Sequence, residues 1–191
     1  MIRLFIAMPL PHQVEKELDR LLGLLRPKGP DVKWVAAKNV HLTIKFLSET
    51  DEELVPKIKT AIDQTCAGYQ PFESVIDQVG GFPGLKNPRV IWVGGSQPIE
   101  AAARMAAEID RRMHELGFEK ETRPFKAHLT LGRVREGRSV AVLSDYLESL
   151  KLTLIPLRLD RLVLFKSTLT PKGSVYERIH ETVLGQERFG G

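Results

Sequence analysis

The strongest constraint on the fold of this 191-residue chain is a strand-like motif that occurs twice. Residues 41–45 read His-Leu-Thr-Ile-Lys, and residues 128–132, 87 positions later, read His-Leu-Thr-Leu-Gly. Successive side chains of a strand point to opposite faces. The leucine and the residue after the threonine therefore share an apolar face, and the histidine and threonine share the other. The repeat predicts two related strands, each with a polar pair opposite its core face.

These polar pairs indicate chemistry on phosphate. His41 with Thr43, and His128 with Thr130, each lie about 7 Å apart along a strand. If a pseudo-two-fold relates the two strands, all four side chains converge on one cleft. Imidazole titrates near neutrality, so one ring can take a proton while the other gives one. Threonine hydroxyls can donate hydrogen bonds to phosphate oxygens.

A zinc site is the main chemical alternative, because two histidines are also common metal ligands. Such sites usually need a third or fourth protein ligand at recognisable spacing. The sequence has no His-Glu-x-x-His motif, and Cys66 is its single cysteine. We therefore expect no metal, and we expect Cys66 to be a buried thiol on a helix.

Hydrophobic spacing predicts an α+β fold. Strands are expected at 3–9, 32–35, 41–47, 72–79, 89–93, 128–134, 157–166 and 175–183, and helices at 11–25, 51–67, 98–116 and 140–150. Thr50 with Glu53 resembles a capping box, although Pro56 favours a later start of that helix. Ser139 is expected to cap the last helix, and residues 170–173 resemble a hairpin turn. Mixed helices and hairpin-linked strands indicate largely antiparallel sheet.

Composition sets few limits on function. The net charge of +4 suits an anionic substrate, but it is too small to identify one. No segment approaches the roughly 20 apolar residues of a membrane span. The apolar run after Arg3 is short and ends at Pro9, so we expect a strand rather than a secretory signal. The prediction is one domain over 1–191 in the cytoplasm, with 184–191 as a mobile tail.

The repeated strands also carry a resemblance to a known family. The chain resembles the RNA 2′,3′-cyclic phosphodiesterases, also called 2′-5′ RNA ligase-like or LigT-like proteins, of the 2H phosphoesterase superfamily. Besides the two motifs, the similar segments are 3–7, 34–35, 81–83, 88–92 and 123–125. Two positions depart from the family pattern: Ser48 stands where glycine is frequent, and Ala127 stands where proline is frequent.

The resemblance implies a bilobal pseudo-two-fold fold, with two largely antiparallel sheets flanked by helices and the site between the lobes. It implies cleavage of an RNA 2′,3′-cyclic phosphate to a 2′-phosphate without a cofactor. His128 is then the base that takes a proton from water, and His41 is the acid that protonates the ribose 3′-oxygen. Thr43 and Thr130 hold the non-bridging oxygens. Arg133 matches a phosphate-binding arginine of the family. Strand alternation, however, places its side chain on the face of the strand that does not carry His128.

Other side chains near the motifs remain open to two interpretations. Lys45 shares strand parity with His41, so it either adds charge to the cleft or is an exposed solubilising lysine. Phe46 and Trp34 are candidates for stacking on a base. Core packing is favoured for Phe46, whereas Trp34 is balanced between the two roles.

Two competing functions remain open at this stage. One is 2′-5′ RNA ligation, in which a 5′-hydroxyl replaces water in the reverse chemistry. The other is a non-catalytic module that binds RNA ends or nucleotides, which does not require both histidines. The expected partners are RNAs with 2′,3′-cyclic phosphate ends, including tRNA fragments, or small cyclic nucleotides. We expect a monomer.

Overall fold

The computed structural model of the protein describes residues 1–171 and 173–185. The strands of this part are β1 (Ile2–Pro9), β2 (Val32–Trp34), β3 (His41–Thr50), β4 (Phe72–Ile76), β5 (Gln78–Phe82), β6 (Val90–Gly94), β7 (Leu129–Val134), β8 (Ile155–Leu159), β9 (Arg161–Thr170) and β10 (Gly173–Val183). Its α-helices are α1 (His12–Leu25), α2 (Val55–Ala67), α3 (Glu100–Glu115) and α4 (Ala141–Ser149). Short 3-10 turns are η1 (Arg26–Lys28), η2 (Ala37–Asn39) and η3 (Glu52–Leu54).

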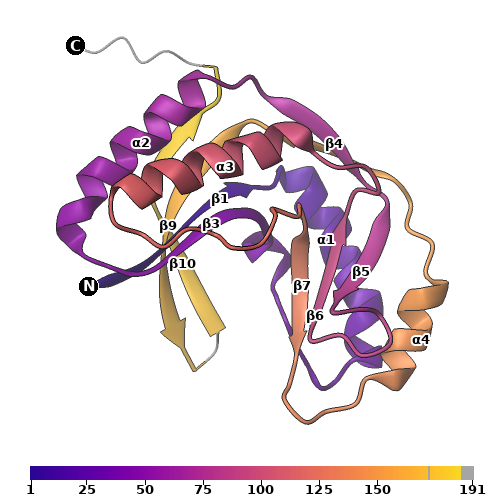
Figure 1. The fold of residues 1–191 in the computed structure, drawn as a ribbon. Coiled ribbons are helices and arrows are strands. Elements are labelled where there is room, and N and C mark those ends of the chain that lie inside the picture. The colour runs from indigo at the N-terminus through magenta and orange to yellow at the C-terminus, as the bar shows by residue number, and fades with distance from the viewer. Residues whose placement is uncertain (172, 186–191) are drawn as a thin grey trace.

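The strands form one large and one small antiparallel sheet, as predicted for an α+β fold. The large sheet runs β10-β9-β1-β3-β7-β6-β5, and β2 pairs with β7 outside this path. The small sheet pairs β4 with β8. Helices α2 and α3 lie over the half that contains β1, β3, β9 and β10, and α1 and α4 lie beside the half that contains β5, β6 and β7 (Figure 1). The two halves meet where β3 pairs with β7.

Alternation along β1 shows how the sheet divides its two faces. Leu4, Ile6 and Met8 belong to the main core under the helices. Phe5 and Ala7 point to the other face, where they form a separate small apolar cluster with strand β9. One face of this half-sheet therefore carries the core, and the opposite face carries an aromatic surface.

Several predicted boundaries are wrong because aspartates interrupt apolar runs. The strand expected at 72–79 is two strands in different sheets, separated at Asp77, whose carboxylate accepts from the Ser96 amide and hydroxyl. Gly80 and Gly81, which follow the expected strand, lie inside β5. The strand expected at 157–166 is likewise divided at Asp160, between β8 and β9.

The predicted helix starts were also only partly correct. Asp51, rather than Thr50, accepts the Glu53 amide. The later start that Pro56 favours is confirmed, because α2 begins at Val55 with Pro56 in its first turn. At α4 the N-cap is Val140, so Ser139 is not the cap. The predicted end of α3 is confirmed, because Gly117 follows it with a positive φ of 96°.

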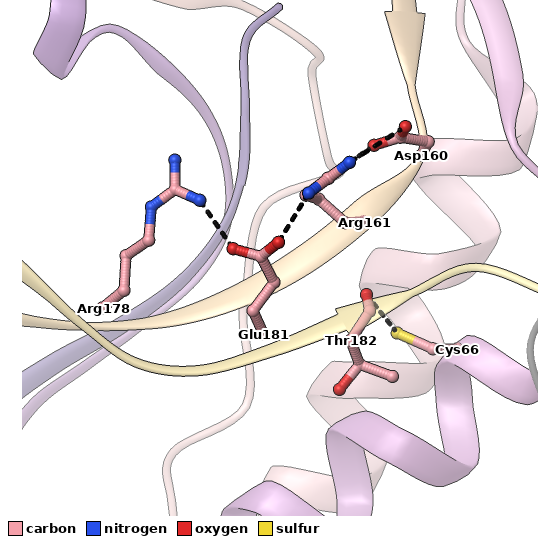
Figure 2. Close-up of polar contacts among 6 residues, drawn as sticks. All are labelled: Cys66, Asp160, Arg161, Arg178, Glu181 and Thr182. Atoms are coloured by element: carbon pink, nitrogen blue, oxygen red, sulfur yellow. Dashed lines mark hydrogen bonds and ion pairs between the residues drawn. The ribbon is translucent and has the colours of Figure 1, made fainter. Parts of the chain in front are cut away.

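Polar contacts join the two strands of the C-terminal hairpin. Antiparallel pairing of β9 with β10 confirms the predicted hairpin, although Lys172 of its turn lies outside the described residues. Arg161 contacts both Asp160 and Glu181, and Arg178 also contacts Glu181 (Figure 2). Of the tail expected at 184–191, Leu184 is buried, and its amide donates to the Asp160 carbonyl. Residues 186–191 lie outside the described part.

Candidate active site

The meeting point of the two half-sheets brings the repeated motifs together. Leu42 of β3 pairs directly with Leu129 of β7. One residue to either side, antiparallel register places His41 across from Thr130 and Thr43 across from His128. Directly opposed residues of such a pair have Cα atoms about 5 Å apart, and residues two apart on one strand are separated by about 7 Å. The four polar residues therefore occupy the corners of a small quadrilateral.

A β-bulge in each motif changes which side chains follow. On β3, Lys45 pairs with Ile6 and Thr43 pairs with Ala7 of β1. Ile44 is therefore an extra residue that has no partner on β1. On β7 the extra residue is Leu131, which is again 87 positions later. A bulge puts two successive residues on one side and shifts the alternation by one.

The two bulges bring one further residue from each motif to the cleft. Arg133 now lies on the same face as Thr130, although simple alternation from His128 predicts the opposite face. Phe46, the corresponding residue of the first motif, is 56% exposed and lines the same cavity. The expectation that Phe46 packs in the core is therefore wrong.

Lys45 is turned away from the cleft by the same bulge. Its side chain is only 2% exposed, and its ammonium lies 2.6 Å from an Asp110 carboxylate oxygen. It also donates to the Glu119 carbonyl at 2.9 Å. Both sequence interpretations, an added cleft charge and an exposed lysine, are wrong. Lys45 instead links the strand of His41 to α3 and to the segment that follows it.

Trp34 has a packing role in this structure. Its indole Nε1 donates to the Gly29 carbonyl at 3.0 Å. A Cβ atom at Gly132 would lie 2.9 Å from the indole ring, so the ring sits closely over this glycine. These contacts place Trp34 against the back of the second motif.

Both histidine rings are held in the same tautomer. His41 Nδ1 lies 2.7 Å from the Asn39 carbonyl oxygen, and His128 Nδ1 lies 2.7 Å from the Lys126 carbonyl oxygen. A carbonyl oxygen can only accept, so Nδ1 carries the hydrogen in each case. The lone pair of each neutral ring is then on Nε2, the atom available to exchange a proton with a ligand.

Aromatic side chains surround each ring. The His41 ring stacks on Phe5 with centroids 4.9 Å apart and meets Tyr176 edge-on at 5.5 Å. The His128 ring meets Phe82 edge-on at 5.0 Å. The Lys126 ammonium lies over the Phe82 ring at 5.2 Å from its centroid. These contacts fix both ring planes and remove water from one side of each ring.

This environment favours neutral imidazoles when no ligand is present. Burial lowers the pKa of His41, although its hydrogen bond to the Asn39 carbonyl opposes this effect. Burial also lowers the pKa of His128, against the bond to the Lys126 carbonyl, and the charges of Arg133 and Lys126 lower it further. Both rings therefore accept a proton less readily than a free imidazole.

The predicted residues divide between two cavities. A cavity of about 200 Å³ is lined by four of them, namely His41, Thr43, Thr130 and Arg133. His128 lines a second cavity of about 380 Å³, together with Trp92 and Lys126. The register of β3 and β7 keeps His128 beside Thr43 even so. These four residues of the two motifs (His41, Thr43, His128 and Thr130), called the quartet below, thus lie with Arg133 in one region of the molecule.

Sequence reasoning missed several side chains in the first cavity. These are Arg3 of β1, Ser167 of β9, and Ser174 and Tyr176 of β10. Arg3 had a usable signal, because it has the same strand parity as Phe5 and Ala7. The β9 and β10 residues had none, since their approach depends on the order of strands in the sheet.

Comparison with known proteins identifies the family. The model of the LigT-like phosphoesterases matches the chain twice, over residues 8–92 and 93–176. The chain belongs to the LigT-like phosphoesterase family. The double match agrees with the internal repeat, since each copy contains one of the two motifs.

Individual relatives support this assignment. An RNA 2′,3′-cyclic phosphodiesterase of Methanocaldococcus jannaschii is 35% identical over 94% of this chain and 99% of its own length. One of Archaeoglobus fulgidus is 33% identical, over 92% of this chain and 97% of its own. A crystal structure of a Thermus thermophilus protein superposes with a TM-score of 0.80 at 26% identity, covering 98% of this chain and 100% of the other. E. coli LigT complexed with 3′-AMP has the same fold, with a TM-score of 0.78 at 23% identity over 97% and 99%.

The described part of the chain contains neither a cluster of metal ligands nor a membrane-spanning helix. In residues 1–171 and 173–185, no group of three or more His, Cys, Asp or Glu side chains is arranged to hold a metal ion. Within the same ranges, no helix combines the length and apolar character needed to span a lipid bilayer.

Proposed function

We propose that this protein hydrolyses 2′,3′-cyclic phosphates at RNA ends, with His41 and His128 as acid and base. The observation that carries the proposal is the quadrilateral at the β3–β7 junction, in which each histidine faces the other motif's threonine. Both rings keep Nε2 available, because Nδ1 is bonded to a carbonyl. The curated relatives named RNA 2′,3′-cyclic phosphodiesterase support the choice of substrate.

The reaction needs one proton taken and one proton given. Nε2 of His128 accepts a proton from water as the water oxygen bonds to phosphorus. The bond between phosphorus and the ribose 3′-oxygen breaks, and Nε2 of His41 protonates that oxygen. The product has a 2′-phosphate and a free 3′-hydroxyl. Paired acid and base catalysis of this kind typically contributes about 10²–10⁴-fold per group.

The remaining cleft residues stabilise charge on the phosphoryl oxygens. Thr43 and Thr130 lie at the other two corners, where their hydroxyls can donate to the two non-bridging oxygens. Arg133 lines the same cavity and adds a fixed positive charge. Donors that are already in place when negative charge develops lower the barrier without reorganisation.

Substrate binding favours the protonated form of His41 that the reaction needs as its acid. Both histidine pKa values are lowered in the unliganded protein, so a neutral base is readily available and a protonated acid is not. An anionic phosphate placed beside His41 favours the imidazolium and raises its pKa again. The enzyme therefore gains its acid mainly in the presence of the substrate.

The test is product analysis with a short RNA that ends in a 2′,3′-cyclic phosphate. We expect a 2′-phosphate end, and no product from the variant that lacks both histidines. Addition of an RNA with a 5′-hydroxyl end tests the reverse reaction, since a 2′-5′ linked product reveals ligation. Unchanged cyclic phosphate with the wild-type protein would refute the proposed activity and leave a binding role.

A further inference from the structure

The cavity that contains His41 continues beyond the catalytic quartet. Its lining also includes Arg3 on β1, Ser167 on β9 and Ser174 on β10. Arg3 and Arg133 are the only lysine, arginine or carboxylate side chains that line this cavity among the described residues. Neither arginine forms an ion pair within residues 1–171 and 173–185. The cavity thus has two positive groups, only one of which the proposed reaction uses.

The register of β1 gives the separation of the two positions. Ala7 pairs with Thr43, which is in the quartet, and Phe5 pairs with Phe46. Arg3 is the next residue with this strand parity, four residues from Ala7. Four residues of an extended strand span about 13 Å between Cα atoms. The His41 ring stacks on Phe5, two residues from Arg3, so Arg3 lies on the Phe5 side of the quartet and is not one of its four corners.

An apolar surface lies between the two positions. The Phe46 ring is 56% exposed and is 6.1 Å from the Phe5 ring. Exposed aromatic rings in nucleic-acid clefts provide stacking surfaces for unpaired bases. Along β1 and β3 the order is therefore the phosphate-reacting quartet, an aromatic ring and an arginine. This sequence of groups matches the cyclic phosphate, the sugar and base, and the preceding phosphate of an RNA end.

We propose that Arg3 binds the internucleotide phosphate that precedes the terminal nucleotide, so that the site favours oligonucleotides over mononucleotides. This proposal rests on the proposed cyclic phosphodiesterase function. Glu49 is the register partner of Arg3 and is the nearest competing charge on β3. It forms no ion pair with Arg3 in the described part and does not line the cavity, so the guanidinium remains available to an anion. Guanidinium groups bind phosphate through charge-assisted hydrogen bonds.

The test compares three substrates by kcat/KM. They are a nucleoside 2′,3′-cyclic phosphate, a dinucleotide with the same cyclic end, and that dinucleotide with a neutral methylphosphonate linkage. We expect the wild-type protein to favour the charged dinucleotide by roughly 10- to 100-fold over the other two, as one charge-assisted contact allows. In Arg3→Gln this preference should largely disappear, and the methylphosphonate replacement should no longer matter.

The controls separate this proposal from the catalytic one. Arg20→Gln, on the exposed face of α1, removes the same charge elsewhere and should keep the wild-type preference. If the wild-type protein hydrolyses both natural substrates but Arg3→Gln keeps the wild-type ratio, the Arg3 assignment is wrong and the catalytic proposal stands. An equal loss on mononucleotide and dinucleotide also overturns the second phosphate site. Hydrolysis of neither substrate by the wild-type protein refutes both proposals.

Discussion

Replacement of Lys45 by methionine should destabilise the protein strongly. The ammonium is buried and within hydrogen-bond distance of two partners, the Asp110 carboxylate at 2.6 Å and the Glu119 carbonyl at 2.9 Å. Burial opposes ionisation of Asp110, but hydrogen bonds from Lys45 and from the Glu121 amide keep its pKa below the ordinary value. Methionine leaves this carboxylate with the amide as its remaining donor.

The expected magnitude follows from the loss of one partner of a buried pair. Such a loss typically costs about 3–5 kcal/mol. For a domain of this size, each kcal/mol lowers Tm by about 2–4 °C, so the expected decrease is on the order of 10 °C. Urea unfolding followed by circular dichroism measures the free energy directly.

Two further variants make the comparison specific. Arg104→Met removes an exposed pair on the same helix α3, where Arg104 and Glu100 are 3.7 Å apart, and should cost less than about 1 kcal/mol. Combining Lys45→Met with Asp110→Leu removes both buried charges and should recover part of the lost stability. A loss below about 1 kcal/mol in Lys45→Met, equal to that in Arg104→Met, would show that the buried pair has no special role.

Three other predictions concern the cleft. Thr43→Ala and Thr130→Ala should each lower kcat/KM by roughly 10- to 100-fold, because each removes one hydrogen bond to charged phosphate. Neither change should alter Tm. Wild-type rates in both variants would show that the threonines contribute only to strand formation. The bell-shaped pH profile of kcat/KM should have its maximum below 6.5, because both histidine pKa values are lowered from that value, and an optimum above about pH 7 would contradict this. Hydrolysis should persist in excess chelator, because two imidazoles can supply the acid and base; activity lost on chelation and restored by one divalent ion would contradict the mechanism.

Alternation of side chains was enough to predict the quartet but not the residues beyond it. His41, Thr43, His128 and Thr130 all precede the bulges, so simple strand parity applies to them. Arg133, Phe46 and Lys45 follow the bulges, and each lies on the face opposite to the one predicted. A bulge depends on the pairing of two strands, so no local sequence signal marks Ile44 or Leu131 as the extra residue.

The backbone at Ser48 gives a physical reason for the glycine that is frequent at this position in the family. Ser48 has a φ of 56°, next to the second register shift between β1 and β3. This left-handed region is easily adopted by glycine and rarely by other residues. The glycine frequent at this position in the family suits such a backbone, and in this chain Ser48 adopts it. The family resemblance thus contained a backbone signal that composition and periodicity did not provide.

Breaks in the strands were harder to predict than the strands themselves. Asp77 and Asp160 each end one strand and begin another, yet the surrounding apolar runs continue through them. Their role depends on partners distant in sequence, namely Ser96 for Asp77 and Leu184 for Asp160. Each of the two aspartates separates a strand of the small sheet, β4 or β8, from a strand of the large sheet, β5 or β9.

The central claim is that His41 is the acid and His128 the base, and a leaving-group experiment tests it most directly. His41→Ala and His128→Ala should each lower kcat/KM on a ribose 2′,3′-cyclic phosphate by roughly 10²–10⁴-fold. A phosphodiester with a much better leaving group than a ribose oxygen needs little protonation. We predict that such a substrate restores much of the activity of His41→Ala and almost none of that of His128→Ala. The reverse pattern would show that the two roles are exchanged, and wild-type activity in both variants would contradict the paired-histidine mechanism.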